Sequence, residues 1–493
     1  MRRGSVLLAV MVIIVLAALI GTSVLYAADA QRGSATLTMQ QAQLRALAWS
    51  GVQGALAELD GQREALMRGE SPVLTGSWEL FEGGVTGSVR LVPLGAEGEF
   101  AASEAARLDL NLASSGMLAK LPGMSEETAG KVISARGQGF GATEELARVE
   151  GLGASVLVDA PVGESAAESD PAPGLLALTT VFSFDPNTTP AGLEKLNVSG
   201  GWSEEQRGPL VERIGAELAA VVEPLLAKAP KLAKESDLVA LLRGAKVAPE
   251  RWEAVLAGIT TSDEAFARGR VDVNRAPVHV LAAIPGLDAP SAEKIVGARG
   301  QLGAEDRARV TWPVTQGLVA ADDFQQALPW LTTRSLQWRV RVEARLERPR
   351  EQGSRLGSTL EADAEVLPPP EMVWEAVIDV ADTRPRVAYL RDVTQWPGLV
   401  RQALAGEQAA ELAVLSEAPE GEEVSDVGPE LEVGRLKSNA GLRLGSMRSQ
   451  SLRLGSSSPG RGDAEAKEED RAASPPPASK DRRIGRWRGS AKE

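Results

Sequence analysis

The sequence contains no cysteine and a single histidine, His279. The lack of cysteine excludes disulfides and thiolate metal sites, and one histidine excludes the zinc sites that need two or more. Aromatic residues are also scarce, at 4%, so any core must be built mainly from Leu, Val, Ala and Ile. Gly-Lys-Ser phosphate loops, Gly-x-Ser-x-Gly elbows and a distinct acid/base pair of carboxylates are absent too. We therefore expect a protein that is not an enzyme and holds no cofactor.

The net charge is −14 at pH 7, which repels nucleic acid unless a local basic patch prevails. Apolar content falls sharply from about residue 405, so we expect a disordered tail over residues 405–493. Within that tail the sequence Leu-Arg-Leu-Gly-Ser occurs at 442–446 and again at 452–456, and residues 482–488 are basic. A solvated tail is the simplest interpretation, and contact with an acidic partner or lipid is the alternative.

The N-terminal segment contains an uncharged run over residues 5–28. As a helix rising about 1.5 Å per residue, this run spans a hydrocarbon core of roughly 30 Å. Arg2 and Arg3 precede it and Asp29 follows it, so the positive-inside rule places the N-terminus in the cytoplasm and the rest of the chain across the membrane. The run is longer than the apolar core of a cleaved secretory signal, although residues 26–29 fit a cleavage site.

The first four residues form a very short basic leader that ends in Gly4. This leader resembles that of type IV prepilins, which prepilin peptidase removes on the cytoplasmic side. The resemblance implies cleavage between Gly4 and Ser5, which leaves the apolar helix on the mature protein. Most pilins have glutamate at the fifth mature position, where this chain has Ala9, and the K-class minor pseudopilins also lack that glutamate. A plain signal anchor and a secretory signal cleaved near Asp29 are the alternatives.

Helical spacing of apolar residues continues past the membrane segment until Gly69 and Pro72 end it. Alternating patterns then predict one early hairpin and several late strands, and the segment between them is helical throughout. An isolated hairpin is not a stable sheet, so the late strands are expected to complete it. The predicted strands cover residues 77–81, 85–92, 337–346, 373–380 and 387–390. Trp78, Trp338 and Trp374 are expected in the core of this sheet.

The predicted fold class is therefore α+β, with a long N-terminal transmembrane helix and a small antiparallel sheet that a large helical insertion interrupts. Stretches 164–173 and 348–371 have the composition of linkers. The predicted segments are a leader (1–4), a transmembrane helix (5–28), the continuing helix and first strands (29–107), the helical insertion (108–330), the returning strands (331–398) and the tail (405–493).

Residues 108–138 and 271–301 are an internal repeat, aligned without a gap and identical at 13 of 31 positions. Each copy predicts two short helices joined by a Pro-Gly turn, with a polar residue placed to cap the second helix. The turn residues are Pro122, Gly123 and Ser125 in the first copy and Pro285, Gly286 and Asp288 in the second.

The repeat resembles the helix-hairpin-helix motif, whose usual turn is Gly-hydrophobic-Gly and whose second helix holds a nucleic-acid phosphate at its N-terminus. Here Ser125 and Asp288 replace the second glycine. Asp288 puts a carboxylate at the anion position, and Glu126 and Glu127 follow Ser125, so we do not expect nucleic acid as a partner despite nearby lysines and arginines. We expect a structural packing unit, with DNA binding as the alternative.

The leader, the repeat and the returning strands together resemble the general secretion pathway protein K (GspK) family, the K-class minor pseudopilins of type II secretion systems. The resemblance covers residues 1 to about 396. It implies a single-pass inner-membrane protein, with its bulk in the periplasm, that caps and primes the pseudopilus and supports protein export. It implies as partners the other minor pseudopilins, the inner-membrane secretion platform, prepilin peptidase and the lipid bilayer. The alternatives are a membrane-tethered DNA receptor and a signal-anchored envelope scaffold.

Some members of that family bind calcium in the head. The acidic residues that could supply oxygen ligands here have no loop spacing typical of such a site, so we expect ordinary surface acids. They are Glu371, Glu375, Asp379, Asp382 and Asp392.

Overall fold

A computed structural model describes residues 3–82, 85–94, 98–157, 173–229, 231–346 and 371–394. The predicted tail and nearly all of the two predicted linkers lie outside these residues. Within them the fold is α+β, as the sequence predicts: a long apolar N-terminal helix, a small antiparallel sheet and many short helices.

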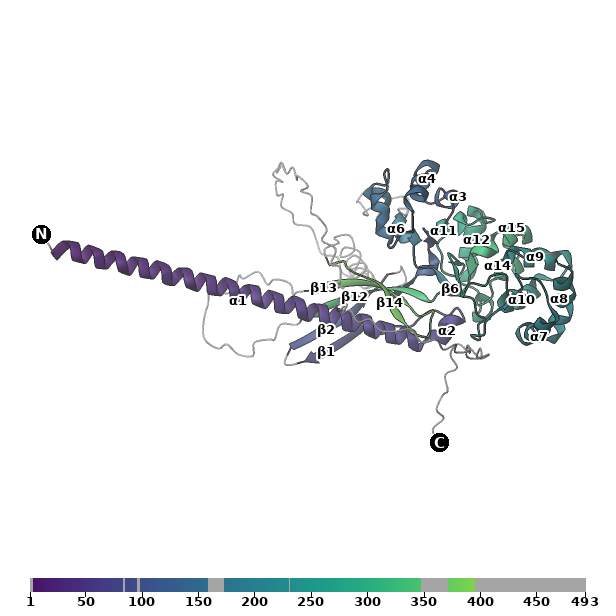
Figure 1. Cartoon of the computed structure of the whole chain (residues 1–493), viewed down its shortest axis with the longest axis horizontal. Coiled ribbons are helices and arrows are strands. Elements are labelled where there is room, and N and C mark those ends of the chain that lie inside the picture. The colour runs from purple at the N-terminus through teal and green to yellow at the C-terminus, as the bar shows by residue number, and fades with distance from the viewer. Residues whose placement is uncertain are drawn as a thin grey trace, which may run out of the picture. The chain divides into compact units, whose positions relative to one another are not determined.

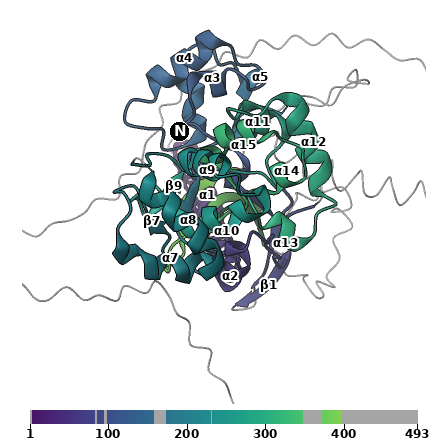
Figure 2. The ribbon, with the colours of Figure 1, turned by 90° about the vertical axis from the view of Figure 1, so that its right-hand side faces the viewer.

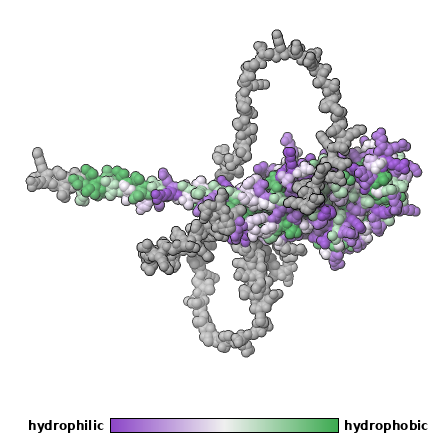
Figure 3. Space-filling view, turned by 90° about the horizontal axis from the view of Figure 1, so that it is seen from below, coloured by the Kyte–Doolittle hydropathy of each residue, from purple (hydrophilic) through white to green (hydrophobic). Residues whose placement is uncertain are grey.

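Helix α1 (Arg3–Gly61) runs for 59 residues without interruption (Figure 1). Its first part is apolar and exposed, and Figure 3 shows it in green at the N-terminal end. The most apolar 18-residue window has a mean hydropathy of 2.5, and none of it is buried. Among the described residues, α1 is the one helix long and apolar enough to cross a membrane.

The second part of α1 is amphipathic and packs on the sheet. Leu44, Ala48, Val52, Ala55 and Leu59 recur at steps of three and four residues and are all buried. The predicted end of this helix at Gly69 is too late. Helix α1 stops at Gly61, and α2 (Arg63–Met67) then adds a separate turn, because Gln62 between them leaves the helical conformation.

The sheet combines strands from both sides of the insertion in the order β1-β2-β12-β13-β14, and every pair is antiparallel. The pairing of β12 with β2 places Val342 opposite Leu91, and its pairing with β13 places Val342 opposite Trp374. β3 pairs with the first part of β12. The strands are β1 (Ser77–Glu82), β2 (Val85–Val92), β3 (Ala101–Ser103), β12 (Gln337–Leu346), β13 (Glu371–Asp379) and β14 (Arg386–Asp392).

Close contact between α1 and the sheet depends on Gly51. A Cβ atom there would lie 2.4 Å from Cγ1 of Val89 and 2.5 Å from Cγ1 of Val342, so only glycine fits without a shift of these two valine side chains. Trp338 is buried in the core between α1 and the sheet, whereas Trp78 and Trp374 are only partly buried at its margin.

The segment between β3 and β12 has its own large core of Leu, Val, Ile and Ala side chains. It is not helical throughout, because short strands of two or three residues frame the helices, and strands this short leave no periodic signal in the sequence. Its elements are η1 (Glu104–Ala106), β4 (Leu108–Asp109), α3 (Ser115–Leu118), α4 (Glu126–Ala135), η2 (Thr143–Arg148), α5 (Ala154–Leu157), α6 (Leu175–Leu178), β5 (Thr179–Thr180), β6 (Phe184–Pro186), β7 (Leu196–Asn197), η3 (Glu204–Gln206), α7 (Arg207–Ile214), α8 (Ala216–Lys228), α9 (Glu235–Gly244), η4 (Pro249–Arg251), α10 (Trp252–Gly258), β8 (Ile259–Thr260), β9 (Phe266–Arg268), β10 (Val271–Asp272), α11 (Val278–Ala283), α12 (Ala289–Arg299), α13 (Ala304–Arg307), α14 (Trp312–Thr315), α15 (Ala321–Ala327), η5 (Leu328–Trp330) and β11 (Leu331–Thr332).

Three units of the insertion share one framework, although the sequence reveals only two copies. In each, an opening strand pairs in parallel with a strand that closes the unit: β4 with β5, β7 with β8, and β10 with β11. We call residues 108–180 the first unit, 196–260 the middle unit and 271–332 the last unit. Figure 2 separates their helices by colour, with α3 and α4 in blue, α7 and α8 in teal, and α11 and α12 in green.

The hydrogen bonds at these strand pairs repeat in all three units. The side-chain oxygen of Asp109, Asn197 or Asp272 accepts from the backbone N–H two residues later, at 2.8, 2.8 and 2.9 Å. The hydroxyl of Thr180, Thr260 or Thr332 likewise accepts from the N–H two residues later, at 3.0, 3.2 and 3.4 Å. The middle unit is therefore a third copy of the framework, with different helices between its strands.

Candidate functional site

The two sequence repeats fold as helical hairpins that are closed by the same arginine contact. Arg136, at the end of α4, donates from Nη2 to the carbonyl oxygen of Ala113 at 2.7 Å. Arg299, at the end of α12, donates from Nη1 to the carbonyl oxygen of Ala276 at 2.7 Å. Each arginine thus ties the second helix of its hairpin to the segment before the first helix.

The Pro-Gly turns use glycine for its conformation and its size. Gly123 and Gly286 have φ values of 73° and 83°, in the left-handed region that favours glycine. A Cβ on Gly286 would also lie 2.2 Å from the carbonyl oxygen of Asp323, at the start of α15. The turn of the last unit is therefore packed directly against another helix backbone. Pro122 and Pro285 precede these glycines in the loops between the helices.

Ser125 and Asp288 both occupy the N-cap positions for which they are suited. The Ser125 hydroxyl accepts from the N–H of Thr128, and the Thr128 hydroxyl accepts from the N–H of Ser125, which completes a capping box. Oδ1 of Asp288 accepts from the N–H of Ser291 at 2.9 Å, and hydrogen bonding from Ser291 lowers the pKa of Asp288. The chain's own side chains thus occupy N–H groups that a helix-hairpin-helix motif offers to phosphate.

Basic side chains near the hairpins are also engaged within the protein. Lys131 lies 3.0 Å from Glu127, and the hydrogen bond and charge of Glu127 raise the pKa of Lys131. Lys120 of the first hairpin donates to the carbonyl oxygen of Ala282 in the last unit at 3.0 Å. The contact of Lys120 joins the two hairpins, and the pairing of Lys131 with Glu127 reduces the positive charge that α4 offers to a nucleic-acid backbone.

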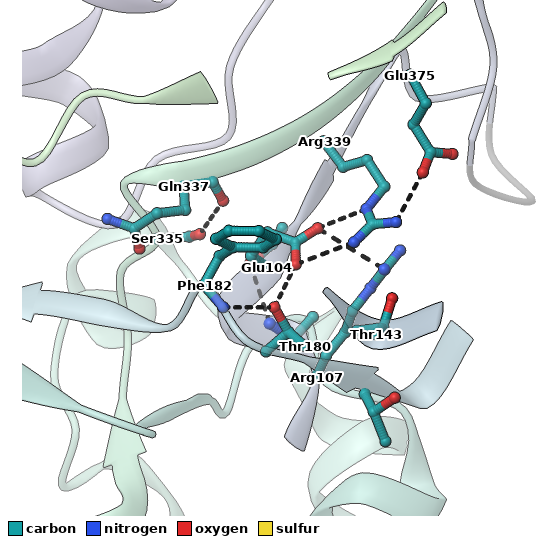
Figure 4. Close-up of polar contacts among 12 residues, drawn as sticks. Glu104, Arg107, Thr143, Thr180, Phe182, Ser335, Gln337, Arg339 and Glu375 are labelled. Carbon is teal, nitrogen blue, oxygen red and sulfur yellow. Dashed lines mark hydrogen bonds and ion pairs between the residues drawn. The ribbon is translucent and has the colours of Figure 1, made fainter. Parts of the chain in front are cut away.

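A buried ion network joins the first unit to the sheet (Figure 4). Arg339 of β12 lies between two carboxylates: Nε donates to Oε1 of Glu104 at 2.7 Å, and Nη1 donates to Oε1 of Glu375 at 2.7 Å. Both carboxylates have no exposed side-chain surface. The hydroxyl of Thr180, at the closing strand of the first unit, also donates to Glu104.

The charges of this network keep its carboxylates ionised despite their burial. Burial alone raises the pKa of Glu375, but Arg339, Arg341 and Arg391 more than offset it, so the pKa falls to about 2. Burial also raises the pKa of Glu104, but the charges of Arg339 and Arg107 outweigh that effect, so the pKa of Glu104 is lowered.

Arg391 of β14 extends the network, because it contacts both Glu375 and Glu144 of the first unit. The sequence singles out only Glu375 among these residues, as an acidic residue weighed for calcium, because the members of the network are far apart along the chain.

A second set of contacts joins the last unit to the sheet and to the segment that follows α2. Arg275 donates to the carbonyl oxygen of Gly69 at 2.9 Å and to the hydroxyl of Ser71 at 3.0 Å, and its guanidinium lies 5.4 Å from the ring centre of Trp338. Arg334, just before β12, donates from Nε to Oδ1 of Asp185 at 2.6 Å. The insertion is thus fixed at both ends.

The remaining candidate residues do not form a site. The five acidic residues weighed for calcium are spread along β13, β14 and the turn between them, and Glu375 and Asp379 are engaged by arginines. Within the described residues no group of three His, Asp or Glu side chains could hold a metal ion. His279 is exposed on α11. Gly4 and Ser5 lie in the first turns of α1.

Comparison with known proteins matches one part of the chain. Residues 103–160, which contain the first unit's hairpin, match the model of a helix-hairpin-helix motif. No curated protein matches the chain. The chain is therefore similar to helix-hairpin-helix proteins over this segment, and its apolar N-terminal helix fits a membrane-anchored protein.

Proposed function

We propose that the protein is a minor pseudopilin of the K class, which primes and caps the pseudopilus of a type II secretion system. The observation that carries the proposal is α1: one unbroken helix is apolar and exposed in its first part and packed on the sheet in its second. A membrane helix that is continuous with the head can leave the bilayer and bundle with sister helices without any change in the head.

The inserted segment supports the capping role. It is fixed to the sheet by the Arg339 network and by Arg275, so the head carries a bulky, rigid addition. A subunit stacking above would have to displace it. In this proposal the protein acts by binding, not by catalysis, and its partners are smaller minor pseudopilins, the inner-membrane platform, prepilin peptidase and lipid.

In the same proposal the N-terminus is cytoplasmic, the helix lies in the inner membrane and the head is periplasmic. Prepilin peptidase cuts between Gly4 and Ser5. Intact mass spectrometry of the full chain, produced with and without the peptidase, tests this step. A mature chain that starts at Ser5 supports the proposal. Retention of Met1 with active peptidase supports a plain signal anchor, and a start near Asp29 supports a secretory signal.

A matched pair of variants tests whether cleavage depends on Gly4. Gly4→Leu should block cleavage, because the peptidase reads the residue before the cut. Gly21→Leu lies in the same helix, where no atom outside the helix lies within 4 Å of an added Cβ, and it should be processed normally. Co-purification of the full chain with smaller minor pseudopilins, and its failure with the major subunit, would support the tip position.

The helix-hairpin-helix match favours one second candidate, a membrane-tethered DNA receptor. The caps at Ser125 and Asp288 oppose it, since they occupy the phosphate-binding N–H groups. A gel shift of the full chain with duplex DNA at two salt concentrations separates the two functions. Salt-dependent binding would favour the receptor, and its absence at low salt would eliminate it.

A further inference from the structure

Asp109 is a buried carboxylate at the strand pair that closes the first unit. It is 4% exposed and lies in β4, opposite Thr180 of β5. Its Oδ1 accepts from the N–H of Asn111 at 2.8 Å, but no salt bridge joins it to another described residue. A buried charge without a partner is costly, so the protonation state of this group affects the stability of the first unit.

In the last unit a salt bridge neutralises the equivalent carboxylate. Asp272 in β10 is fully buried and lies 2.5 Å from Nη1 of Arg275, three residues later. The first unit has Leu112 at the place of that arginine. The middle unit has the uncharged Asn197, which is also less buried than Asp109. Among the three equivalent positions, Asp109 is therefore the carboxylate without a salt bridge in the described chain.

The charged groups of the elements around Asp109 have other partners. They are Arg136 of α4, bound to the carbonyl oxygen of Ala113; Glu104 of η1, bound to Arg339; Arg107, 3.7 Å from Glu104; and Arg270 before β10, bound to Glu235. β5 and residues 181–183 contribute no charged side chain.

Burial consequently has the largest effect on Asp109. It raises the pKa of this carboxyl to about 6, although hydrogen bonds from the backbone of Asn111 and Ser183 and the charge of Arg136 act in the opposite direction. The group is therefore mostly protonated at about pH 5 and mostly ionised at about pH 7.5.

The place of Asp109 connects its protonation to the junction with the sheet. Leu110, the next residue, donates from its N–H to the carbonyl oxygen of Thr180 at 2.8 Å. The hydroxyl of Thr180 donates to Glu104, which in turn pairs with Arg339 of β12 (Figure 4). Separation of β4 from β5 therefore weakens one of the contacts that tie the first unit to the sheet.

We propose that Asp109 is a proton-dependent switch that holds β4 and β5 together in mild acid and lets them separate more readily at neutral pH. The protonated carboxyl is compatible with burial, whereas the ionised carboxylate is a buried charge without a salt bridge. The folded chain holds this proton more tightly than the unfolded chain, in which the pKa is 3.8. The stabilisation is thus complete below that value and is lost as the pH rises through about 6. The switch is independent of the assembly role.

Hydrogen exchange of the full chain in a non-ionic detergent, measured by mass spectrometry at about pH 5 and about pH 7.5, tests the proposal. After correction for the intrinsic exchange rates, protection of residues 108–113 and 179–183 should be roughly tenfold lower at the higher pH. The equivalent residues 271–276 and 331–335 of the last unit should change less, because Asp272 is paired. Equal protection of the first unit at the two pH values overturns the proposal.

Three variants connect the effect to Asp109. Asp109→Asn keeps an acceptor but cannot ionise, so it should abolish the difference between the two pH values. Asn197 shows that asparagine fits this framework position. The exposed Asp263→Asn is the control and should keep the difference of the parent.

If Asp109→Asn does not fold, Leu112→Arg decides. Leu112 is 40% exposed, and an arginine there stands where Arg275 pairs with Asp272, so the difference between the two pH values should again disappear. A difference that persists in the folded variants overturns the proposal.

Discussion

Nε of Arg339 lies 2.7 Å from Oε1 of Glu104, although 235 positions separate the two residues along the chain. Glu104 opens the insertion and Arg339 lies just after it closes, so this contact ties the two ends of the insertion to the sheet. The relationship explains how the chain can depart from a sheet for more than 200 residues and return to the adjacent position.

Arg339→Met is expected to destabilise the protein by about 3–5 kcal/mol, because it leaves Glu104 and Glu375 buried without their main cation. Arg309, whose partner is also exposed, provides the control: Arg309→Met should cost less than about 1 kcal/mol. Denaturant unfolding of the full chain in detergent measures both. Equal small effects of the two changes would show that the network is not needed to hold the insertion.

Acid should weaken the fold through Glu375, whose pKa falls from its usual 4.5 to about 2 in the folded chain. A carboxylate with a lowered folded pKa stabilises above its unfolded pKa, and that stability is lost as the pH falls toward the folded value. We expect stability to decline between about pH 4.5 and 2, by at most ~1.4 kcal/mol per pH unit from this group.

Glu375→Gln should be less stable than the parent at pH 7 and should decline less steeply in acid. Glu217→Gln, on an exposed side chain, is the control and should follow the parent curve. Chemical unfolding at a series of pH values measures the slopes. Parallel curves for Glu375→Gln and the parent would contradict the assignment.

Gly286→Ala should destabilise the last unit by roughly 1–3 kcal/mol, since φ is 83° and the new Cβ would lie 2.2 Å from the Asp323 carbonyl oxygen. Gly297→Ala, within α12 and with no atom outside the local helix backbone within 4 Å of the added Cβ, should instead stabilise by up to about 1 kcal/mol. Thermal unfolding distinguishes the two. Destabilisation of similar size in both would mean that the turn is not tightly packed.

The equivalence of the three units predicts which substitutions the middle unit accepts. Asn197 holds the position of Asp109 and Asp272, so Asn197→Asp should change stability by less than about 0.5 kcal/mol, whereas Asn197→Ala should cost about 1 kcal/mol by removing the acceptor for the Ser199 N–H. Unfolding midpoints of both variants test this. A larger loss for the aspartate than for the alanine would contradict the equivalence.

The sequence predicts much of this architecture because its signals are periodic and local. The uncharged run over residues 5–28, the alternating strand over 337–346 and the caps at Ser125 and Asp288 are all visible within a few turns of chain. The middle unit cannot be recognised from the sequence, because it shares with the other two units only single residues such as Asn197 and Thr260. These residues lie in strands of two residues, which are too short to give a periodic signal. The Glu104–Arg339 pair could not be found, because burial and distant pairing leave no local trace.

In the proposed function α1 is drawn out of the bilayer, and its unbroken course from Arg3 to Gly61 would then make movement of the helix and movement of the head a single event. An axial pull on the apolar end cannot be absorbed by a loop between these residues. It passes to the strands through the tight seam at Gly51, where the helix backbone meets Val89 and Val342. In that function each advance of one residue, ~1.5 Å along the axis, would carry the strands forward by the same distance.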